Sequence, residues 1–333
     1  MITTTLLFSL VTAGPVVELQ ATPVPLPGSP GRVVMDYLAV DHSGHHVWVP
    51  AGNTARVDLV DTRSLGVTEL GGFATATRGE RVVGPSSVTV GEHHAWVGNR
   101  ATSQVCAVAL EPAALAGCVT LASSPDGLAY VPSTREVWVT TPRDHSLTVL
   151  DVSTPERPRV SEVIPVGGEP EGYAVDAAAG RFYTNLEDKD ATLAFDVKTR
   201  VQVARWSPGC GEAGPRGLAL DAARGLLVVA CTDGAVVLAL RDGGKVRGRL
   251  TTAGGVDNID YAPARHAVYV ASGRGATLTV AALGDDGSLE PRVRARTAEG
   301  ARVVVTDAEG TAYVADSAGG RLLVVRVPLD TTR

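Results

Sequence analysis

One phrase of this sequence recurs about every 45 residues, and this repeat limits the possible folds more than any other feature. The clearest copy, 168–197, reads GEPEGYAVDAAAGRFYTNLEDKDATLAFDV. Three runs of β-branched and aromatic residues, separated by turn residues, predict three short strands. Successive copies begin 50, 40, 45, 45, 41 and 45 residues apart. Four-stranded propeller blades repeat at about this spacing, and no 3.6-residue apolar period points to helical repeats.

The repeat therefore predicts an all-β fold, a seven-bladed β-propeller with four-stranded antiparallel blades. Radial packing covers the edges of each short sheet, but the ring must also close. The last copy supplies three strands, at 303–306, 311–315 and 321–327. We expect the N-terminal run 16–26 to complete this blade, which would hold both ends of the chain in one sheet. The 37 glycines and 20 prolines are spread through the turns that such a fold needs.

Several copies of the repeat contain short sequence motifs that also occur in other propellers. They are Tyr37-Leu-Ala-Val-Asp41, Pro170-Glu-Gly-Tyr-Ala-Val-Asp176 with Phe182-Tyr-Thr-Asn185, and Pro215-Arg-Gly-Leu-Ala-Leu-Asp221. These phrases resemble the YVTN-type, YncE-like repeats of bacterial seven-bladed β-propellers, over nearly the whole chain. The resemblance implies the fold. Families of this architecture include binding proteins, cofactor-carrying oxidoreductases, lactonases and lyases, so it does not select a chemistry.

The repeats predict one propeller domain over 15–330, preceded by a short apolar segment. Residues 1–14, MITTTLLFSLVTAG, have an apolar centre and a small residue at Ala13, so we interpret them as a signal segment, although a basic start is missing. No run approaches the ~20 apolar residues of a spanning helix. The net charge of −6 and the lack of long Lys/Arg runs argue against nucleic acid as a partner. We expect a monomer.

The four cysteines fall into two plausible pairs. Cys106 and Cys118 lie on the third and fourth predicted strands of blade two, around a turn. Cys210 precedes the first strand of blade five and Cys231 ends its second strand. Two disulfides would indicate an oxidising compartment, hence a periplasmic or secreted protein. The alternative is four buried thiols in a cytoplasmic protein.

Residues at the same position of each copy should form rings around the central channel. The first ring precedes the first strand of each blade, and the second ring lies near the end of each second strand, on the same face. The first ring carries four carboxylates, one hydroxyl and two guanidinium groups, which must be paired, hydrated or bound to a ligand. The first ring is Asp36, Ser86, Asp126, Glu171, Arg216, Asp257 and Arg302, and the second is Ala51, Asn99, Thr141, Asn185, Cys231, Ser272 and Asp316.

Three interpretations of the first ring compete. Arg216 and Arg302 could neutralise neighbouring carboxylates in a purely structural network. The carboxylates with Asn185 or Asn99 could instead hold Ca²⁺ or another divalent cation, because hard cations take oxygen ligands. The set we name for it is Glu171, Asn185 and Asp257. The ring could also bind a small polar ligand, with the arginines gripping a carboxylate or phosphate in bidentate fashion.

The leading functional hypothesis is a non-catalytic scaffold that binds a small polar molecule or another protein at the face where the first strands begin, with no certain cofactor. The alternative is a metal-dependent hydrolase resembling propeller lactonases, with Asp36 as general base beside Glu171, Asn185 and Asp257. Ion pairs of Arg216 and Arg302 would favour the scaffold, and a metal bound by several carboxylates would favour the hydrolase.

Two further features bear on the channel. A streptogramin-opening lyase would require histidines there, and no histidine falls in either ring. Trp48, Trp96 and Trp138 share one second-strand position, and we interpret them as packing between blades. The insertion 71–83 lengthens the connection to blade two and forms either a rim over the central pocket or an elongated outer hairpin.

Overall fold

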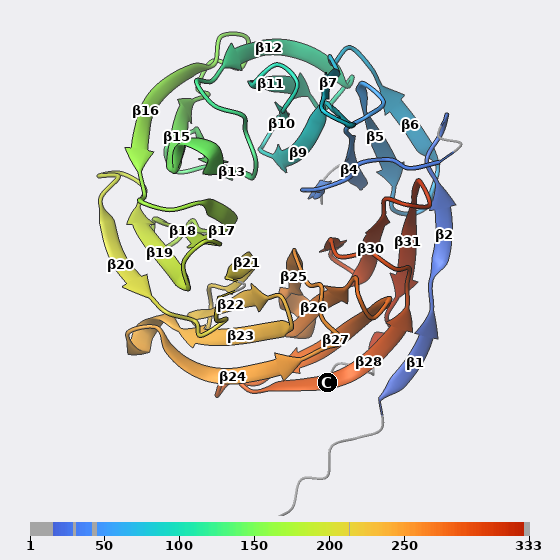
Figure 1. Cartoon of the computed structure of the whole chain (residues 1–333), viewed down its shortest axis with the longest axis vertical. Helices are drawn as coiled ribbons and strands as arrows, with labels where there is room; N and C mark the ends of the chain where they lie inside the picture. Colours follow the sequence, from blue (N-terminus) through green and yellow to red (C-terminus); the bar gives the residue numbers. More distant parts are fainter. Residues whose placement is uncertain (1–15, 29–30, 42–44, 213, 330–333) are drawn as a thin grey trace, which may run out of the picture.

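The structure of this chain is a computed structural model that describes residues 16–28, 31–41, 45–212 and 214–329. Seven antiparallel sheets stand around a central axis, as in a propeller (Figure 1). The predicted seven-bladed fold is thus confirmed. The predicted signal segment 1–14 lies outside the described residues.

Each blade runs from an inner to an outer strand in chain order. Blades one and two are β3 (Ala39–Asp41), β4 (His46–Ala51), β5 (Arg56–Asp61) and β6 (Val67–Leu70), then β9 (Pro85–Val90), β10 (His94–Asn99), β11 (Gln104–Ala109) and β12 (Ala114–Thr120). Blades three and four are β13 (Leu128–Val131), β14 (Glu136–Thr141), β15 (Ser146–Asp151) and β16 (Arg159–Pro165), then β17 (Pro170–Asp176), β18 (Arg181–Leu186), β19 (Ala191–Asp196) and β20 (Gln202–Trp206).

The remaining blades follow the same order. Blades five and six are β21 (Pro215–Asp221), β22 (Leu226–Cys231), β23 (Gly234–Ala239) and β24 (Lys245–Thr251), then β25 (Ile259–Ala262), β26 (Ala267–Ser272), β27 (Thr277–Leu283) and β28 (Leu289–Arg296). Blade seven has β29 (Val304–Thr306), β30 (Thr311–Asp316) and β31 (Arg321–Arg326). Three short 3₁₀ helices, η1 (Pro142–Asp144), η2 (Leu240–Asp242) and η3 (Pro263–Arg265), lie in connecting turns.

The N-terminal run closes the ring, but in two pieces. β2 (Thr22–Pro25) pairs antiparallel with β31 and supplies the fourth strand of blade seven, as predicted. β1 (Val17–Gln20), expected in the same blade, pairs instead parallel with β28 and becomes a fifth strand of blade six. The N-terminal segment therefore joins the outer edges of two neighbouring blades (Figure 1).

The core lies between the blades, because each sheet buries its faces against its neighbours. Trp48, Trp96 and Trp138 are at most 2% exposed, which confirms their predicted packing role. Trp138 of blade three meets Phe182 of blade four with ring centroids 4.8 Å apart. Tyr269 and Tyr313 fill the equivalent second-strand positions of blades six and seven and are fully buried.

Both predicted disulfides are present, Cys106–Cys118 and Cys210–Cys231. The first joins directly opposed residues of β11 and β12, and the second joins the loop before β21 to the end of β22. Two disulfides are consistent with an oxidising, extracytoplasmic location. A search of the described residues finds no helix with the length and apolar character that crossing a membrane requires.

The closure can be tested at Val24, which is 6% exposed and packs into the cluster between blades seven and one. We expect Val24→Asp to lower the free energy of unfolding by about 2 kcal/mol or more, because a charge would be buried without a partner. Chemical denaturation measures this change. Thr22→Asp, at an exposed position of the same strand, is the control and should have a small effect. Equal effects would show that β2 does not seal the ring.

Candidate functional site

The structure gathers most of the first ring around the axis. Three carboxylates from different blades, Asp36, Glu171 and Asp257, are close enough to influence one another electrostatically. Asp126 joins them through Arg100, whose guanidinium donates to Asp36 at 2.7 Å and to Asp126. Ser86 has a different role, because its buried hydroxyl lies 3.5 Å from the carbonyl oxygen of Gly98, within its own blade.

The two ring arginines both form ion pairs. Arg302 Nε lies 3.0 Å from Asp257 Oδ2, and Arg216 pairs with Glu187. Sequence analysis named neither Glu187 nor Arg100, because both fall just beyond the second-strand positions that were aligned. We refer to these charged groups together as the axial network. It comprises Asp36, Asp126, Glu171, Glu187 and Asp257 with Arg100, Arg216 and Arg302.

The axial network holds five carboxylates against three guanidinium groups, so its negative charge is not fully compensated. Burial raises the pKa of Glu171, and the neighbouring charge of Asp36 raises it further. Burial likewise raises the pKa of Asp257 to about 7, with added repulsion from Asp36 and Glu171, although Arg302 opposes the shift. Protonation of Asp257 is therefore easier than that of an ordinary aspartate.

Two tyrosines form part of the channel wall beside the axial network. Tyr37 donates its hydroxyl to Glu171 Oε1 at 2.8 Å, and its ring stacks on Tyr173 with centroids 5.6 Å apart. Burial raises the pKa of Tyr37 well above its usual value, and the charge of Glu171 adds to the effect. Neither tyrosine was among the site residues predicted from the sequence. The signal was present, because Tyr37 follows Asp36 directly and Tyr173 follows Glu171 by two residues.

The second ring supports loops and contributes no side chain to the axial network. Asn185 is fully buried; its amide nitrogen donates to the carbonyl oxygens of Arg216 and Gly217, and its oxygen accepts from Thr192 at 2.7 Å. Asn99 similarly binds the carbonyl oxygen of Ala74 at 3.0 Å. The amide of Asn185 thus fastens blade four to blade five.

The arrangement gives little support to the predicted divalent-cation site. Within the described ranges, no group of three or more His, Cys, Asp or Glu side chains is placed to hold a metal ion. The set Glu171, Asn185 and Asp257 would need the amide of Asn185, whose hydrogen bonds go to the backbone and to Thr192. Asp36, the predicted general base, is held by Arg100.

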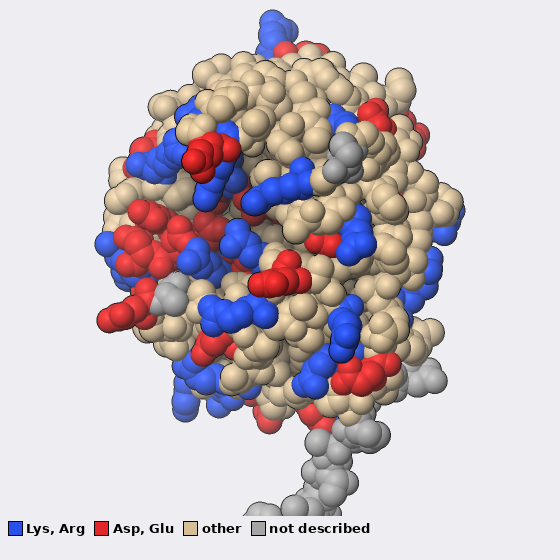
Figure 2. Space-filling view, turned by 45° about the vertical axis from the view of Figure 1, so that its right-hand side comes forward, with Lys and Arg blue, Asp and Glu red and all other residues tan. Residues whose placement is uncertain are grey.

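A pocket of about 330 Å³ opens beside the axial network, between blades five, six and seven. It is lined by three arginines, Arg216, Arg274 and Arg302, and by two acids, Asp257 and Glu299. The Arg302 side chain is 61% exposed, so its guanidinium is accessible although it pairs with Asp257. We call this the mixed-charge pocket. In the space-filling view, acidic and basic side chains gather together around a hollow in the surface (Figure 2).

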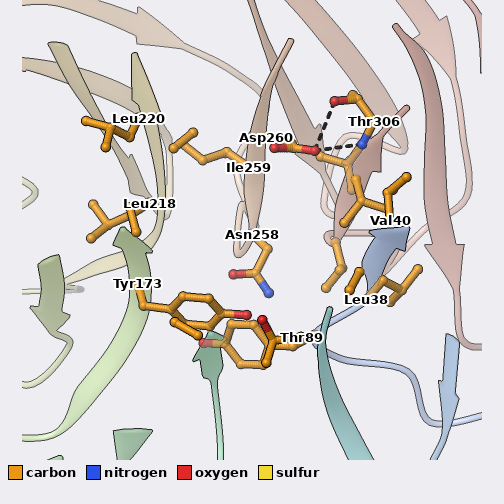
Figure 3. Close-up of a pocket in the computed structure, with 18 of the residues that line it drawn as sticks. Leu38, Val40, Thr89, Tyr173, Leu218, Leu220, Asn258, Ile259, Asp260 and Thr306 are labelled. Carbon is orange, nitrogen blue, oxygen red and sulfur yellow. Dashed lines mark hydrogen bonds between the residues drawn. The ribbon is translucent and has the colours of Figure 1, made fainter. Parts of the chain in front are cut away.

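Further along the axis, the first strands enclose a cavity of about 400 Å³ with a largely apolar wall. Figure 3 shows Leu38, Leu218 and Ile259 around this space, with the amide of Asn258 turned toward Tyr173. Asp260 also lines the cavity, but it accepts hydrogen bonds from the backbone and hydroxyl of Thr306, at 2.7 and 3.0 Å. The channel therefore changes from charged to mostly apolar on passing Tyr37 and Tyr173.

The insertion before blade two forms a hairpin of β7 (Ala76–Arg78) and β8 (Arg81–Val83). Arg78 donates to the carbonyl oxygens of Arg100 and Ala101, at 3.2 and 3.4 Å. Because Arg100 belongs to the axial network, the hairpin lies at the rim of the charged site. Of the two predictions for this insertion, the structure favours the rim.

Comparisons with known proteins identify the fold alone. No protein-family model matches the sequence, and no curated protein matches it. A chain of the mitotic checkpoint complex matches with a TM-score of 0.74 and 14% identity, over 98% of this chain and 99% of that chain. Hydrazine synthase from Kuenenia stuttgartiensis matches with a TM-score of 0.74 and 15% identity, over 92% of this chain and 99% of that chain. A streptogramin B lyase matches with a TM-score of 0.71 and 9% identity, over 91% of this chain and 96% of that chain. Such identities support a common architecture and leave the activity open.

The shifted carboxyl at the axis predicts a pH dependence of stability. The pKa of Asp257 is about 7 in the folded protein and 3.8 without its environment. The folded state therefore binds the proton of the Asp257 carboxyl more tightly than the unfolded state does. Protonation of Asp257 stabilises the fold at low pH, and this stabilisation is lost as pH rises from about 4 to about 7. We expect Asp257→Asn to flatten the fall in melting temperature between pH 5 and pH 8. Asp144→Asn, an exposed carboxylate of η1, should keep the wild-type slope, and identical slopes in all three proteins would refute the shift.

Proposed function

We propose that this chain is a non-catalytic binding protein of the YncE-like propeller type, whose mixed-charge pocket takes a small polar ligand. The ligand carries a carboxylate or similar anionic group together with an amino or hydroxyl group. The observation that carries this proposal is the pocket itself, because it presents accessible guanidinium groups beside the exposed carboxylate of Glu299 and the buried carboxylate of Asp257. A ligand with both kinds of group complements it, since arginine forms bidentate bonds to carboxylates and acids accept from amines or hydroxyls.

The internal pairing of the axial network supports binding over catalysis. Arg216 pairs with Glu187 and Arg302 pairs with Asp257, which is the arrangement expected of a scaffold. Such pairs hold the charged side chains in place before a ligand arrives, so less conformational entropy is lost on binding. None of the described histidines lines the mixed-charge pocket or the apolar cavity, so a histidine-dependent lyase is less well supported.

Arg274 is the group most available to the ligand. In the described part of the chain its guanidinium has no ion pair, and its backbone nitrogen is fixed by a hydrogen bond of 3.1 Å to the carbonyl oxygen of Gly254. We assign Arg274 and the outer nitrogens of Arg302 to the anionic group. Glu299 and Asp257 then face the amino or hydroxyl group. The two disulfides support the proposal that this monomeric protein works in the periplasm or outside the cell.

Calorimetric titration with a panel of amino acids and 2-hydroxy acids tests this assignment. We expect at least one compound to bind the wild-type protein, and Arg274→Gln to weaken that binding about tenfold, which corresponds to about 1.4 kcal/mol. Arg205→Gln is the matched control, because Arg205 is an exposed arginine on the outer strand β20, outside the pocket. Absence of binding across the panel, or equal losses in both variants, would contradict the proposal.

A hydrolase of the lactonase type is the second candidate, and one observation favours it. Asp257, with a pKa of about 7, can exchange a proton near neutral pH, as a general acid or base must. Elemental analysis of protein purified without chelator, combined with lactone and ester assays, separates the candidates. Our proposal predicts that the wild-type protein contains no stoichiometric metal. It also predicts that the wild-type protein turns over lactones and esters no faster than the Asp36→Asn variant, which lacks the general base of the hydrolase hypothesis. Metal lost in both Glu171→Ala and Asp257→Ala, with turnover abolished, would establish the hydrolase instead.

A further inference from the structure

A second pocket on the first-strand face has four arginines among its nine lining residues. It has a volume of about 260 Å³ and lies between the β7–β8 hairpin, the end of β10 and blade three. Its arginines come from four separate segments: Arg78 from β7, Arg81 from β8, Arg100 from the turn after β10, and Arg143 from η1. Asp126 is the only acid among its lining residues. We call it the arginine pocket.

We propose that the arginine pocket binds a tetrahedral oxyanion, a phosphate or sulfate group. This site is distinct from the mixed-charge pocket and does not depend on the function proposed above. Four guanidinium groups line the pocket, against Asp126 in its wall and Asp36, which pairs with Arg100 from outside it; two positive charges remain in excess, in a protein whose net charge is −6. Like charges that converge in one concave site repel each other, and a bound anion of matching charge removes that repulsion.

The charge is concentrated on groups without internal partners. Asp126 already pairs with Arg100, so it does not neutralise the rest of the pocket. Among the described residues, Arg81 and Arg143 have neither an ion pair nor a side-chain hydrogen bond, and both are exposed at the pocket wall. Their donors are therefore free for a ligand. Arginine forks match the geometry of phosphate and sulfate oxygens, and the hydroxyl of Ser124, also in the wall, adds a neutral donor.

Other contacts hold the pocket in shape. Arg78 reaches from the hairpin to the carbonyl oxygens of Arg100 and Ala101, which fixes the insertion against the turn after β10. The guanidinium of Arg100 is in turn oriented by Asp36 and Asp126. Pro125 and Pro142 form part of the opposite wall, where the backbone is restricted. The insertion thus adds two arginines, at positions where they meet two from neighbouring blades.

An isolated pocket suits a single oxyanion better than a polymer. A nucleic-acid surface requires a basic stripe that follows successive phosphates, and the mixed-charge pocket next to the axis interrupts any such stripe with Asp257 and Glu299. The oxyanion can be a free ion or the terminal group of a larger ester. The volume of the pocket is several times the volume of one water molecule in the liquid, about 30 Å³, so it accommodates a free oxyanion or the terminal group of an ester.

Isothermal titration with inorganic phosphate and with sulfate, at constant ionic strength, tests the proposal. We expect saturable binding to the wild-type protein and a loss of fivefold or more in each of Arg81→Gln and Arg143→Gln. Arg81→Lys keeps the positive charge but cannot form the two parallel hydrogen bonds of a guanidinium group, so this variant should bind phosphate with part of the wild-type affinity. Arg205→Gln, an exposed arginine elsewhere, should bind as the wild-type protein does. The side chains of Arg81, Arg143 and Arg205 are exposed, so the variants should fold, and melting curves check this.

The outcomes distinguish a free oxyanion from the terminal group of an ester, and they distinguish the proposal for the arginine pocket from the proposal for the mixed-charge pocket. Glycerol 3-phosphate that binds tenfold tighter than inorganic phosphate would assign the site to an ester, and equal affinities would assign it to the free ion. Non-saturable binding, or equal losses in Arg81→Gln and Arg205→Gln, would overturn the proposal, as would an oligonucleotide that binds tighter than both phosphates. Arg274→Gln should leave phosphate binding unchanged, so failure of the mixed-charge pocket and failure of the arginine pocket are distinguishable.

Discussion

Packing between blades is the interaction on which the rest of this molecule depends. A single four-stranded sheet has two faces to bury and no partner of its own, so each blade is stable only between two others. The large second-strand side chains, Trp138 against Phe182 for example, fill these interfaces. The ring then has to close without a gap, and β2 does this by pairing with β31. Once it is closed, carboxylates from distant parts of the chain, such as Asp36 and Asp257, lie close enough at the axis to influence each other electrostatically.

This convergence has an electrostatic cost. Each blade places its first-ring residue at the axis whatever its charge, so carboxylates from different blades are brought together and partly removed from water. Arg100, Arg216 and Arg302 compensate part of the charge; burial, together with the repulsion that remains, raises the pKa values of Glu171 and Asp257. Groups held in this way destabilise the fold slightly and are common where a protein binds a ligand. The cost is confined to one end of the channel, because the wall beyond Tyr37 and Tyr173 is mostly apolar.

The repeat period was enough to predict the blades and to make both cysteine pairs plausible, because these depend on spacing along the chain; of the predicted closure, β2 took the expected place and β1 did not. The period also located the first ring, six of whose seven members enter the axial network or pair with it. The second ring was less well predicted. A side chain near a strand end can face the channel or the neighbouring blade, and Asn185 faces its neighbour because backbone carbonyls there need a donor. The tyrosines of the channel wall were missed although they lie next to the ring residues, because β17 is irregular between Pro170 and Tyr173 and the spacing alone does not show which way the ring of Tyr173 faces. The parallel pairing of β1 with β28 depends on how the two outer edges meet, which no local pattern records.

Arg100 connects the two parts of the first-strand face. Its guanidinium lines the arginine pocket and at the same time compensates Asp36 and Asp126. An anion bound beside Arg100 would share its donors with these acids and leave Asp36 less well compensated. Asp36 in turn raises the pKa of Asp257, which lines the mixed-charge pocket. Occupancy of one pocket would thus change the protonation of the other, and thermodynamic linkage requires the influence to run equally in both directions.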